Sequence, residues 1–402
     1  MRSLFFVGNR NAASKATKGG LIILAAYTAV QRGNDNAHSF EQESNFWYLT
    51  GINEPDWWLI VDGTRGKSWL VAPEIDSVHQ TFEGSLPHDE AVKISGVNDI
   101  ISHDDALKLL RELAKKHGVA YTLGEHPHRE HFNFIENPAQ KKLSNVLERM
   151  FSSVQDCRKD MAQLRAIKQP EEIAAMKKAI RLTCDTFNIV KQKLSTFHYE
   201  YEVEAEFDYH FKKHGSHHGY DPIVAGGKNA CTLHYMKNNA TLKKGSLLLL
   251  DIGARHAGYS ADISRTFAIG QPTKRQLEVH ASVERAHKEI IALLRPGLSV
   301  AEYSQKVDII MKRALIDIGL LKQLDDNSTY RRYFPHAISH GLGVDVHDSF
   351  GGAAVFKEGM ALTVEPGIYI AEESIGVRIE DDILVTKTGH TNLSGRLSTG
   401  LV

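Results

Sequence analysis

Two segments in the second half of the chain each read as a pair of strands that brings two acidic side chains face to face. In the first, SLLLLDIGARHAGYSADISRTF (246–267), Asp251 and Asp262 lie at equal distances from the midpoint between His256 and Ala257. A hairpin symmetric about that midpoint places the two carboxylates opposite each other. Directly opposed like charges destabilise a β-ladder, and an unpaired charge after a run of leucines is costly to bury. The segment therefore predicts a cation between the two aspartates.

The second segment repeats this arrangement with glutamates. Its runs MALTVEPGIYI (360–370) and GVRIEDDILV (376–385) predict a hairpin joined through Ala371–Ile375, in which Glu365 and Glu380 lie nearly equidistant from the middle. Each acid taken singly is most simply a solvated surface group. The paired spacing and the apolar flanks, taken together, indicate a metal site instead.

Histidine completes the set of possible ligands. Strand alternation places Arg378, Glu380 and Asp382 on one face of the second hairpin. The stretch ISHGLGVDVHD (338–348) supplies histidines, and neutral imidazole is a common metal ligand. Four carboxylates with one nitrogen suit Mn²⁺, Co²⁺ or two Zn²⁺ ions better than a structural zinc. Two ions that share carboxylates can activate one bridging water, so the sequence predicts a hydrolytic metal centre.

Length and composition predict two domains and exclude several partners. A chain of 402 residues exceeds what one hydrophobic core usually fills. Its 48 basic and 49 acidic side chains give a net charge of -1, and therefore no field that attracts nucleic acid or a membrane surface. The three cysteines are far apart and in no CxxC arrangement, which fits a reducing compartment and a cytoplasmic location.

The N-terminal arm leaves one alternative open. It contains five basic residues before Asp35 and no acidic one, as an organelle transit peptide does. We favour a basic arm that leads into a first strand within Leu21–Val30. That apolar run is too short to span a bilayer.

The order of apolar runs predicts an α/β first half. Strands are expected at 21–30, 57–63 and 68–74, and helices at 104–118 and 138–151. The segment 152–172 is expected to connect two domains, and Pro170 opens the next predicted helix. The predicted domains are residues 1–155 and 156–402.

Together these motifs resemble the Xaa-Pro peptidases, the aminopeptidase P and prolidase branch of the pita-bread metallopeptidases. The stretches that carry the resemblance are DIGARHAGYSADISRTF, HAISHGLGVDVHD, TVEPGIYI and GVRIEDDI, with FEQESNFWYLTGINEPD (40–56) similar to the N-terminal domain of aminopeptidase P and related prolidases. The resemblance implies a two-domain α/β protein. Residues 1–155 would form a creatinase/aminopeptidase P-like α/β domain, and residues 156–402 a pita-bread α+β catalytic domain.

The resemblance also implies a site with two divalent metal ions, Mn²⁺ foremost and Co²⁺ or Zn²⁺ as alternatives. Its ligands would be Asp251, Asp262, His340, Glu365 and Glu380. Asp262 and Glu380 would bridge the ions, Asp251 would complete one, and His340 and Glu365 the other. Glu365 would also act as a proton shuttle. Because all five residues are present, a metal-free creatinase-like enzyme and the non-enzymatic relatives fit less well.

Five further residues acquire expected roles from the resemblance. His336 and His347 would line the cleft, contact the scissile peptide and stabilise its tetrahedral intermediate. His234, in ACTLHYMKN, would lie on the substrate side, and Arg378 beside the bridging glutamate. Tyr220 would hydrogen-bond near a ligand aspartate and orient it.

The activity that the resemblance implies is hydrolysis of the peptide bond before proline. A water shared by the two ions would attack the carbonyl, releasing the N-terminal residue from Xaa-Pro peptides. The alternative is a prolidase restricted to dipeptides, which the short link Ala371–Ile375 favours, whereas NFWYLTGINEPD (45–56) favours the aminopeptidase. A non-catalytic pita-bread binding protein is a further alternative. The expected partners are proline-containing peptides and a second copy of the chain, in a homodimer or higher oligomer, without nucleic acid or membrane.

Overall fold

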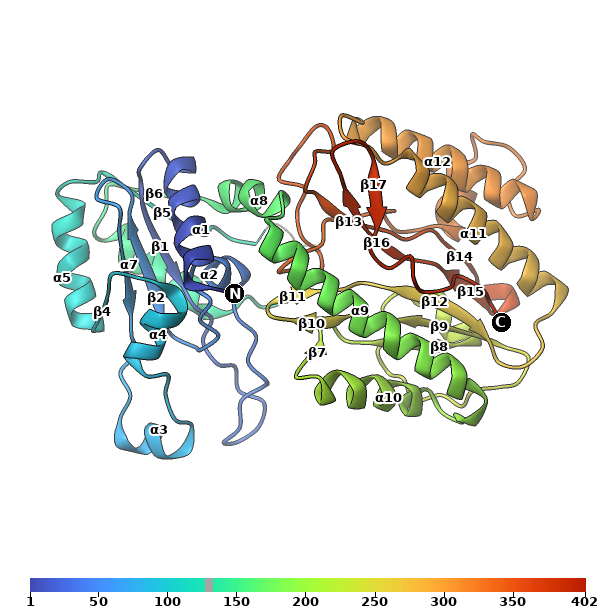
Figure 1. Cartoon of the computed structure of the whole chain (residues 1–402), viewed down its shortest axis with the longest axis horizontal. Helices are drawn as coiled ribbons and strands as arrows, with labels where there is room; N and C mark the ends of the chain where they lie inside the picture. The colour runs from blue at the N-terminus through green and yellow to red at the C-terminus, as the bar shows by residue number, and fades with distance from the viewer. Residues whose placement is uncertain (127–132) are drawn as a thin grey trace. The chain divides into compact units, whose positions relative to one another are not determined.

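The computed structural model describes residues 1–126 and 133–402 and divides into two compact units. The first comprises Met1–Leu164 and the second Arg165–Val402. The helix α8 (Arg158–Ala166) extends across the division. Both units combine helices with sheets (Figure 1), as the predicted two-domain α/β class requires. None of the described helices is both long and apolar enough to cross a membrane.

A six-stranded sheet forms the centre of the first unit, in the order β4-β3-β2-β1-β5-β6. β2 is antiparallel to both neighbours, and the other pairs are parallel. All five residues of β1 are buried, as expected for a continuous apolar run in a sheet covered on both faces. The strands are β1 (Leu21–Ala25), β2 (Trp58–Asp62), β3 (Lys67–Val71), β4 (Asp99–Ile101), β5 (Val119–Thr122) and β6 (Ser153–Asp156).

The helices of the first unit include one where the sequence predicts only a basic arm. α1 is a full helix that buries Phe5, Phe6 and Arg10, and Arg10 donates to the carbonyl oxygens of Leu49 (2.7 Å), Ser95 (2.9 Å) and Gly96 (2.9 Å). Those carbonyls lie at the ends of α2 and α4 and have no partner further along their own helices. The described helices are α1 (Ser3–Ala16), α2 (Ser44–Thr50), α3 (Ser77–Phe82), α4 (His88–Ser95), α5 (His103–Ala114) and α7 (Pro138–Glu148).

The segment 152–172 is not the simple connection that we expected. It contains β6, which pairs in parallel with β5 at the edge of the sheet, and α8. The short strand SVQD carries little apolar character, because an edge strand with a partly exposed face does not need it. The sheet therefore continues beyond the last apolar run of the first half.

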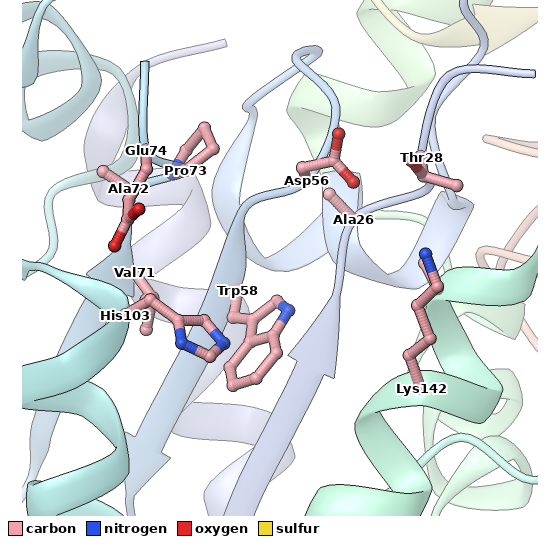
Figure 2. A pocket seen from close by; sticks show the side chains of 11 residues that line it. Ala26, Thr28, Asp56, Trp58, Val71, Ala72, Pro73, Glu74, His103 and Lys142 are labelled. Atoms are coloured by element: carbon pink, nitrogen blue, oxygen red, sulfur yellow. The ribbon is translucent and has the colours of Figure 1, made fainter. Parts of the chain in front are cut away.

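A cavity of about 380 Å³ lies in the first unit, where β1 and β3 end and α5 and α7 begin. Figure 2 shows the rings of Trp58 and His103 side by side, with Lys142 extending from α7 on the other side. The ring centroids of Trp58 and His103 are 4.6 Å apart. None of the residues that line this cavity is a predicted metal ligand.

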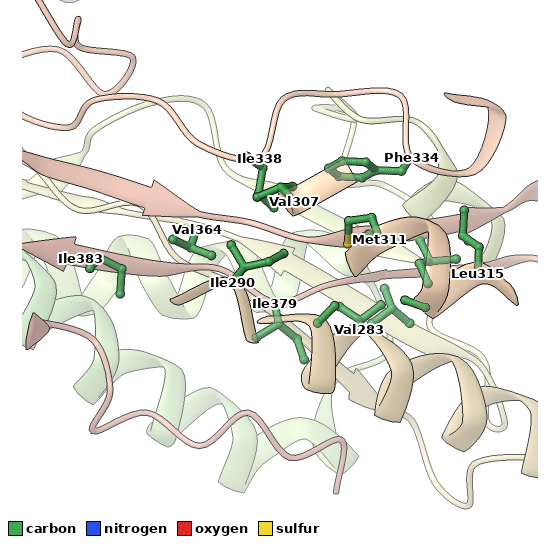
Figure 3. Packing of buried hydrophobic residues seen from close by; sticks show 14 of the residues in the cluster. Val283, Ile290, Val307, Met311, Leu315, Phe334, Ile338, Val364, Ile379 and Ile383 are labelled. Carbon is green, nitrogen blue, oxygen red and sulfur yellow. The ribbon is translucent and has the colours of Figure 1, made fainter. Parts of the chain in front are cut away.

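The second unit packs helices against several small sheets. A buried hydrophobic cluster joins α11 and α12 to the strands β13–β16, and Figure 3 shows Ile290, Met311 and Val364 within it. The helices are α9 (Pro170–Lys193), α10 (Glu200–Lys213), α11 (Lys274–Leu293), α12 (Val300–Asp317) and α13 (Asn327–Tyr333), with short 3₁₀ turns η1 (Leu194–Thr196), η2 (Gly227–Cys231) and η3 (Ala371–Glu373).

Four sheets are formed by the strands of the second unit, in the orders β11-β10-β7, β12-β9-β8, β13-β16-β17 and β14-β15. These sheets supply the strand ends on which the acidic residues lie. The strands are β7 (His217–His218), β8 (Ile223–Gly226), β9 (Leu247–Asp251), β10 (Ala254–His256), β11 (Tyr259–Ser260), β12 (Ser264–Ala268), β13 (Ala361–Val364), β14 (Gly367–Ile370), β15 (Ile375–Arg378), β16 (Asp381–Val385) and β17 (His390–Asn392).

The predicted register of the first hairpin is wrong by two residues. Asp251 pairs with Ser264 rather than with Asp262. The turn centres on Ala257 and Gly258, which both have positive φ (50° and 83°), as the tight hairpin turns with two such residues require. Because side chains alternate with a period of two, this offset keeps both aspartates on one face.

The predicted register of the second hairpin is confirmed. Gly367 pairs with Arg378 and Val364 with Asp381, and these two ladders are in the same register. Glu365 and Glu380 lie in the short interruption between the ladders. They are therefore directly across from each other, as their spacing predicts.

Candidate metal centre

Four carboxylates of the second unit lie next to strand ends. Asp251 is the last residue of β9, and Asp262 lies between β11 and β12. Glu365 directly follows β13, and Glu380 directly precedes β16. A hydrogen bond from the Glu380 N–H to the Ser264 carbonyl (3.0 Å) joins the two hairpins. The strands thereby bring both pairs of acids to one place.

Ligand atoms of five predicted residues lie within 4.8 Å of one another in two groups. One group is formed by Asp251, Asp262 and Glu380, and the other by His340, Glu365 and Glu380. Glu380 is common to both groups. The geometry therefore provides two adjacent cation positions with a shared carboxylate.

Burial and mutual repulsion disfavour the ionised forms of three of these acids, Asp262, Glu365 and Glu380. Burial first, and then the charge of Glu380, raises the pKa of both Asp262 and Glu365 well above the ordinary range. Burial, and then the charge of Asp251, raises the pKa of Glu380 to about 8. A cation among the carboxylates would favour their charged forms instead. The electrostatics of the cluster therefore favour the binding of a cation.

Tyr220 links the two aspartates. Its Oη lies 2.8 Å from Asp251 Oδ1 and 2.7 Å from Asp262 Oδ1. Burial, and then the charges of these aspartates, raises the pKa of Tyr220, so the hydroxyl keeps its proton. Since it has a single proton, it donates to one carboxylate at a time. It holds both oxygens at a fixed separation.

Arg378 braces the other side of the cluster with three hydrogen bonds. Nη2 donates to Asp251 Oδ2 (2.6 Å), Nε to Ser264 Oγ (2.8 Å) and Nη1 to Tyr369 Oη (2.8 Å). Ser264 Oγ in turn donates to Glu380 Oε2 (2.7 Å). The guanidinium therefore orients one carboxylate of the cluster directly and a second through the serine hydroxyl.

His340 presents a free ring nitrogen to the acids. Its Nδ1 lies 2.9 Å from the Gly341 carbonyl oxygen, so Nδ1 carries the proton. Nε2 then has its lone pair available, 3.5 Å from Asp262 Oδ2 and 3.5 Å from Glu365 Oε1. Burial, and then the neighbouring His347, lowers the pKa of His340 to about 4. The imidazole is thus neutral, as a metal ligand must be.

His336 lies beside the cluster in a fixed orientation. Its Nδ1 donates to the Ala337 carbonyl oxygen (2.7 Å), and its Nε2 lies 2.8 Å from Tyr369 Oη. Burial, and then the positive charge of Arg378, lowers the pKa of His336 to about 3. The imidazole is therefore neutral, and its Nε2 can exchange the hydrogen bond with Tyr369 for one with another group without a change in charge.

The two remaining predicted histidines are exposed. The ring of His347 lies 4.4 Å from that of His340, and its ligand atoms form a third group with Asp262 and His340. His234 lies on the segment between η2 and β9 and makes no hydrogen bond or ion pair with the part of the chain that the structure describes. The structure thus brings His347 to the cluster but does not place His234 in contact with it.

Three side chains of the site were absent from the sequence-based prediction. Ser264 and Tyr369 connect Arg378 to Glu380 and His336, as described above. Thr363 accepts from the His340 N–H (3.2 Å) and lies 3.4 Å from Glu365 Oε1. Strand alternation would have placed Thr363 on the face of Glu365, but no sequence pattern distinguishes a serine, threonine or tyrosine in this role.

The donor set fits a divalent ion with a preference for oxygen. Four carboxylates and one neutral imidazole converge, and no cysteine belongs to any of the ligand groups formed by the described residues. Mn²⁺, Co²⁺ and Zn²⁺ all accept this mixture, whereas a structural zinc prefers thiolates. The hydrogen bonds from Tyr220 and Arg378 supply the outer contacts that orient such ligands.

Both halves of the chain match known sequence families. The profile of Metallopeptidase family M24 matches residues 174–387, which include every residue of the cluster. The profile of the aminopeptidase P N-terminal domain matches residues 6–121. The catalytic motifs and the first unit therefore point to the same group of proteins.

Individual proteins are similar over nearly their whole length. The Xaa-Pro aminopeptidase of Escherichia coli (strain K12) is 33% identical over 94% of this chain and 90% of its own. The structure of E. coli aminopeptidase P with the inhibitor Pro-Leu superposes with a TM-score of 0.87, at 31% identity, over 100% of this chain and 96% of that one. Proline aminopeptidase P II from Yersinia pestis gives a TM-score of 0.85, at 31% identity, over 100% and 98%.

Proposed function

This chain belongs to metallopeptidase family M24, and from that premise we propose that it is a Xaa-Pro aminopeptidase, which releases the N-terminal residue from peptides with proline second. The observation that carries the proposal is the pair of ligand groups that share Glu380. Two adjacent cation positions suit hydrolysis of an amide by one activated water. The near full-length similarity to Xaa-Pro aminopeptidases supports the choice of substrate.

The proposed metal ligands are Asp251, Asp262, His340, Glu365 and Glu380. Asp262 and Glu380 are the proposed bridging ligands, because they are the two carboxylates that belong to two of the three groups, and a carboxylate has two oxygens that can bind different ions. We propose two divalent ions, Mn²⁺ foremost, with Co²⁺ or Zn²⁺ as alternatives. When bound, the ions would supply Lewis-acid polarisation of the substrate carbonyl and an activated water.

The protein residues would position the peptide and move protons around this centre. Glu365 is proposed to accept a proton from the attacking water and to pass it to the leaving prolyl nitrogen. His336, neutral and held by Tyr369, would hydrogen-bond the scissile peptide. His347 and His234, both exposed, would contact the substrate from the open side.

We also propose a cellular location and an oligomeric state for the enzyme. Two of the three free cysteines, Cys157 and Cys184, are buried, and burial raises the pKa of each to about 12. Thiols protected in this way suit a reducing compartment, and we propose a cytoplasmic location. A homodimer or a higher homo-oligomer is the proposed assembly.

A prolidase restricted to dipeptides is the second candidate, because the link between β14 and β15 is only η3 and Ser374. The test is to chelate the protein, restore Mn²⁺, Co²⁺ or Zn²⁺, and compare hydrolysis of an Xaa-Pro-Pro tripeptide with that of Gly-Pro. Metal-dependent release of the first residue of the tripeptide supports the aminopeptidase. Cleavage of the dipeptide alone supports the prolidase, and no cleavage with any metal contradicts both.

A further inference from the structure

The glycine-rich loop 340–348, which carries His340 and His347, packs against a buried cluster of ion pairs formed by Arg165, Lys168 and Asp348. We propose that Asp348, held by Lys168 and Arg165, is a positioning residue that fixes this loop and thereby sets the metal affinity of the centre. The inference rests on the proposed metal centre. It assigns a role to Asp348 and to the glycines of ISHGLGVDVHD, which the proposed chemistry itself does not use.

The two ion pairs of Asp348 are almost completely withdrawn from water, whereas Arg165 Nη2 also pairs with the half-exposed Asp345 of the same loop (2.5 Å). Lys168 Nζ lies 3.0 Å from Asp348 Oδ2, and Arg165 Nη2 lies 3.1 Å from Asp348 Oδ1. The exposed fractions of the three side chains are 1% for Lys168, 3% for Asp348 and 5% for Arg165. Both carboxylate oxygens of Asp348 thus have a cationic partner, which fixes the orientation of the side chain in two directions.

The backbone of Asp348 closes the loop. Its N–H donates to the Gly341 carbonyl oxygen (2.8 Å), and these two residues form an isolated β-bridge. Gly341 directly follows His340, and Asp348 directly follows His347. The bridge therefore joins the two residues next to the imidazoles, whose ring centroids are 4.4 Å apart. A shift of Asp348 would move both histidines.

The glycines of the loop leave room for this arrangement. A Cβ at Gly341 would lie 2.6 Å from the Asp348 carbonyl oxygen. A Cβ at Gly343 would lie 2.4 Å from Asp348 Oδ2 and 2.6 Å from Lys168 Nζ. The Gly343 carbonyl also accepts from the Ser260 N–H (3.0 Å). The loop backbone thus packs directly on the ion pair, and only glycine permits that approach.

The energetics favour a positioning role over a contribution to stability alone. A buried ion pair adds little net stability compared with apolar residues of the same shape, because both charges lose their water. Its geometry, by contrast, is specific. Lys168 is anchored twice more, since its N–H donates to Gly359 O (2.8 Å) and its Nζ donates to the Arg165 carbonyl. The cation is therefore a fixed point against which the loop is held.

The test measures metal binding directly in the full-length protein. Asp348→Asn keeps the size of the side chain and removes its charge, and Lys168→Met keeps the stem and removes the cation. Free Mn²⁺ is followed by electron paramagnetic resonance, and the absorption spectrum of the Co²⁺-loaded protein reports on ligand geometry. We expect each variant to bind Mn²⁺ at least about tenfold more weakly, which is the usual effect of losing a group that orients a metal ligand. The absorption spectrum of the Co²⁺-loaded variant should also change.

Two controls separate positioning from folding and from the proposed function. Each single variant leaves the other partner of the Lys168–Asp348 pair as an unpaired buried charge. The variant Lys168→Met/Asp348→Asn removes both charges, so it tests Mn²⁺ affinity without that unpaired charge. Asp185→Asn breaks the exposed pair with Arg396 (2.9 Å) and should leave Mn²⁺ affinity unchanged. Folded variants that bind Mn²⁺ as tightly as the wild type would overturn the positioning role alone. A wild-type protein that binds no divalent ion would overturn the metal centre and the positioning role together.

Discussion

Arg378 Nη2 lies 2.6 Å from Asp251 Oδ2, and the exposed fractions of the two side chains are 5% and 14%. The other oxygen of Asp251, Oδ1, accepts from Tyr220. Both oxygens of this carboxylate are therefore oriented by protein donors before any ion is bound. A ligand held in this way loses little conformational freedom when it coordinates a metal.

Replacing Arg378 with lysine should lower kcat/KM by about 10- to 100-fold, because an ammonium keeps the charge but cannot make the three directed hydrogen bonds. Steady-state kinetics at saturating Mn²⁺ on an Xaa-Pro-Pro peptide measure the effect. Arg396→Lys, in an exposed ion pair with Asp185, is the matched control and should behave as wild type. An Arg378→Lys enzyme within twofold of wild type would contradict the assigned role.

The paired acids could be found from the sequence because hairpin registers are local. The spacing of Glu365 and Glu380 gave the observed register, and that of Asp251 and Asp262 gave the correct face but a pairing wrong by two residues. The error has a physical cause. The turn is set by the residues that adopt positive φ, Ala257 and Gly258, and not by the symmetry of the acids.

Other parts of the site depend on contacts that no local pattern reveals. Tyr369 contacts both His336 and Arg378, and Ser264 contacts Glu380 across 116 positions in the sequence. The buried pair of Lys168 and Asp348 spans 180 positions. Such pairs follow from the packing of distant elements, so propensity and periodicity in one sequence cannot specify them. Nor could they indicate α1, whose burial depends on the carbonyls that Arg10 contacts.

Replacing Tyr220 with phenylalanine should weaken Mn²⁺ binding by about tenfold, because Asp251 and Asp262 lose their shared donor and the two carboxylates repel each other without it. The dissociation constant for Mn²⁺, measured by electron paramagnetic resonance on the chelated protein, provides the readout. Tyr209→Phe, at an exposed tyrosine of α10, should leave the constant unchanged. Equal affinity in Tyr220→Phe and wild type would rule out this orienting role.

His287 should make the stability of the protein depend on pH. Burial lowers its pKa to about 4 from the ordinary 6.5, opposed in part by Asp381, whose Oδ2 lies 3.5 Å from Nε2. Between these two pKa values the unfolded chain binds the proton and the folded chain does not. The free energy of unfolding is therefore highest above pH 6.5 and falls as the pH is lowered toward 4. The loss is at most about 3 kcal/mol.

The pH effect is checked by denaturant unfolding of the wild type and of His287→Leu at several values between pH 4.5 and 7.5. The free energy of unfolding of the wild type should fall more steeply on acidification than that of the variant, which has no imidazole to protonate. The comparison cancels the carboxylates of the metal centre, since both proteins retain them. Parallel curves would show that His287 titrates alike in the folded and unfolded chains.

Replacing Glu380 with glutamine should stabilise the metal-free protein while abolishing its stabilisation by metal. In the chelated protein Glu380 faces other buried acids, and burial together with Asp251 raises its pKa to about 8. Glutamine removes that repulsion and keeps an oxygen for the Ser264 hydroxyl. Each kcal/mol gained should raise the Tm of a domain of this size by about 2–4 °C.

Wild type, by contrast, should gain about 2.7 kcal/mol when Mn²⁺ is present at 100 times its Kd. Thermal unfolding with chelator and with Mn²⁺, alongside Glu289→Gln at an exposed position of α11, separates the two effects. A chelated Glu380→Gln protein that melts below chelated wild type would show that Glu380 stabilises the fold by itself, and that the cluster does not require a cation.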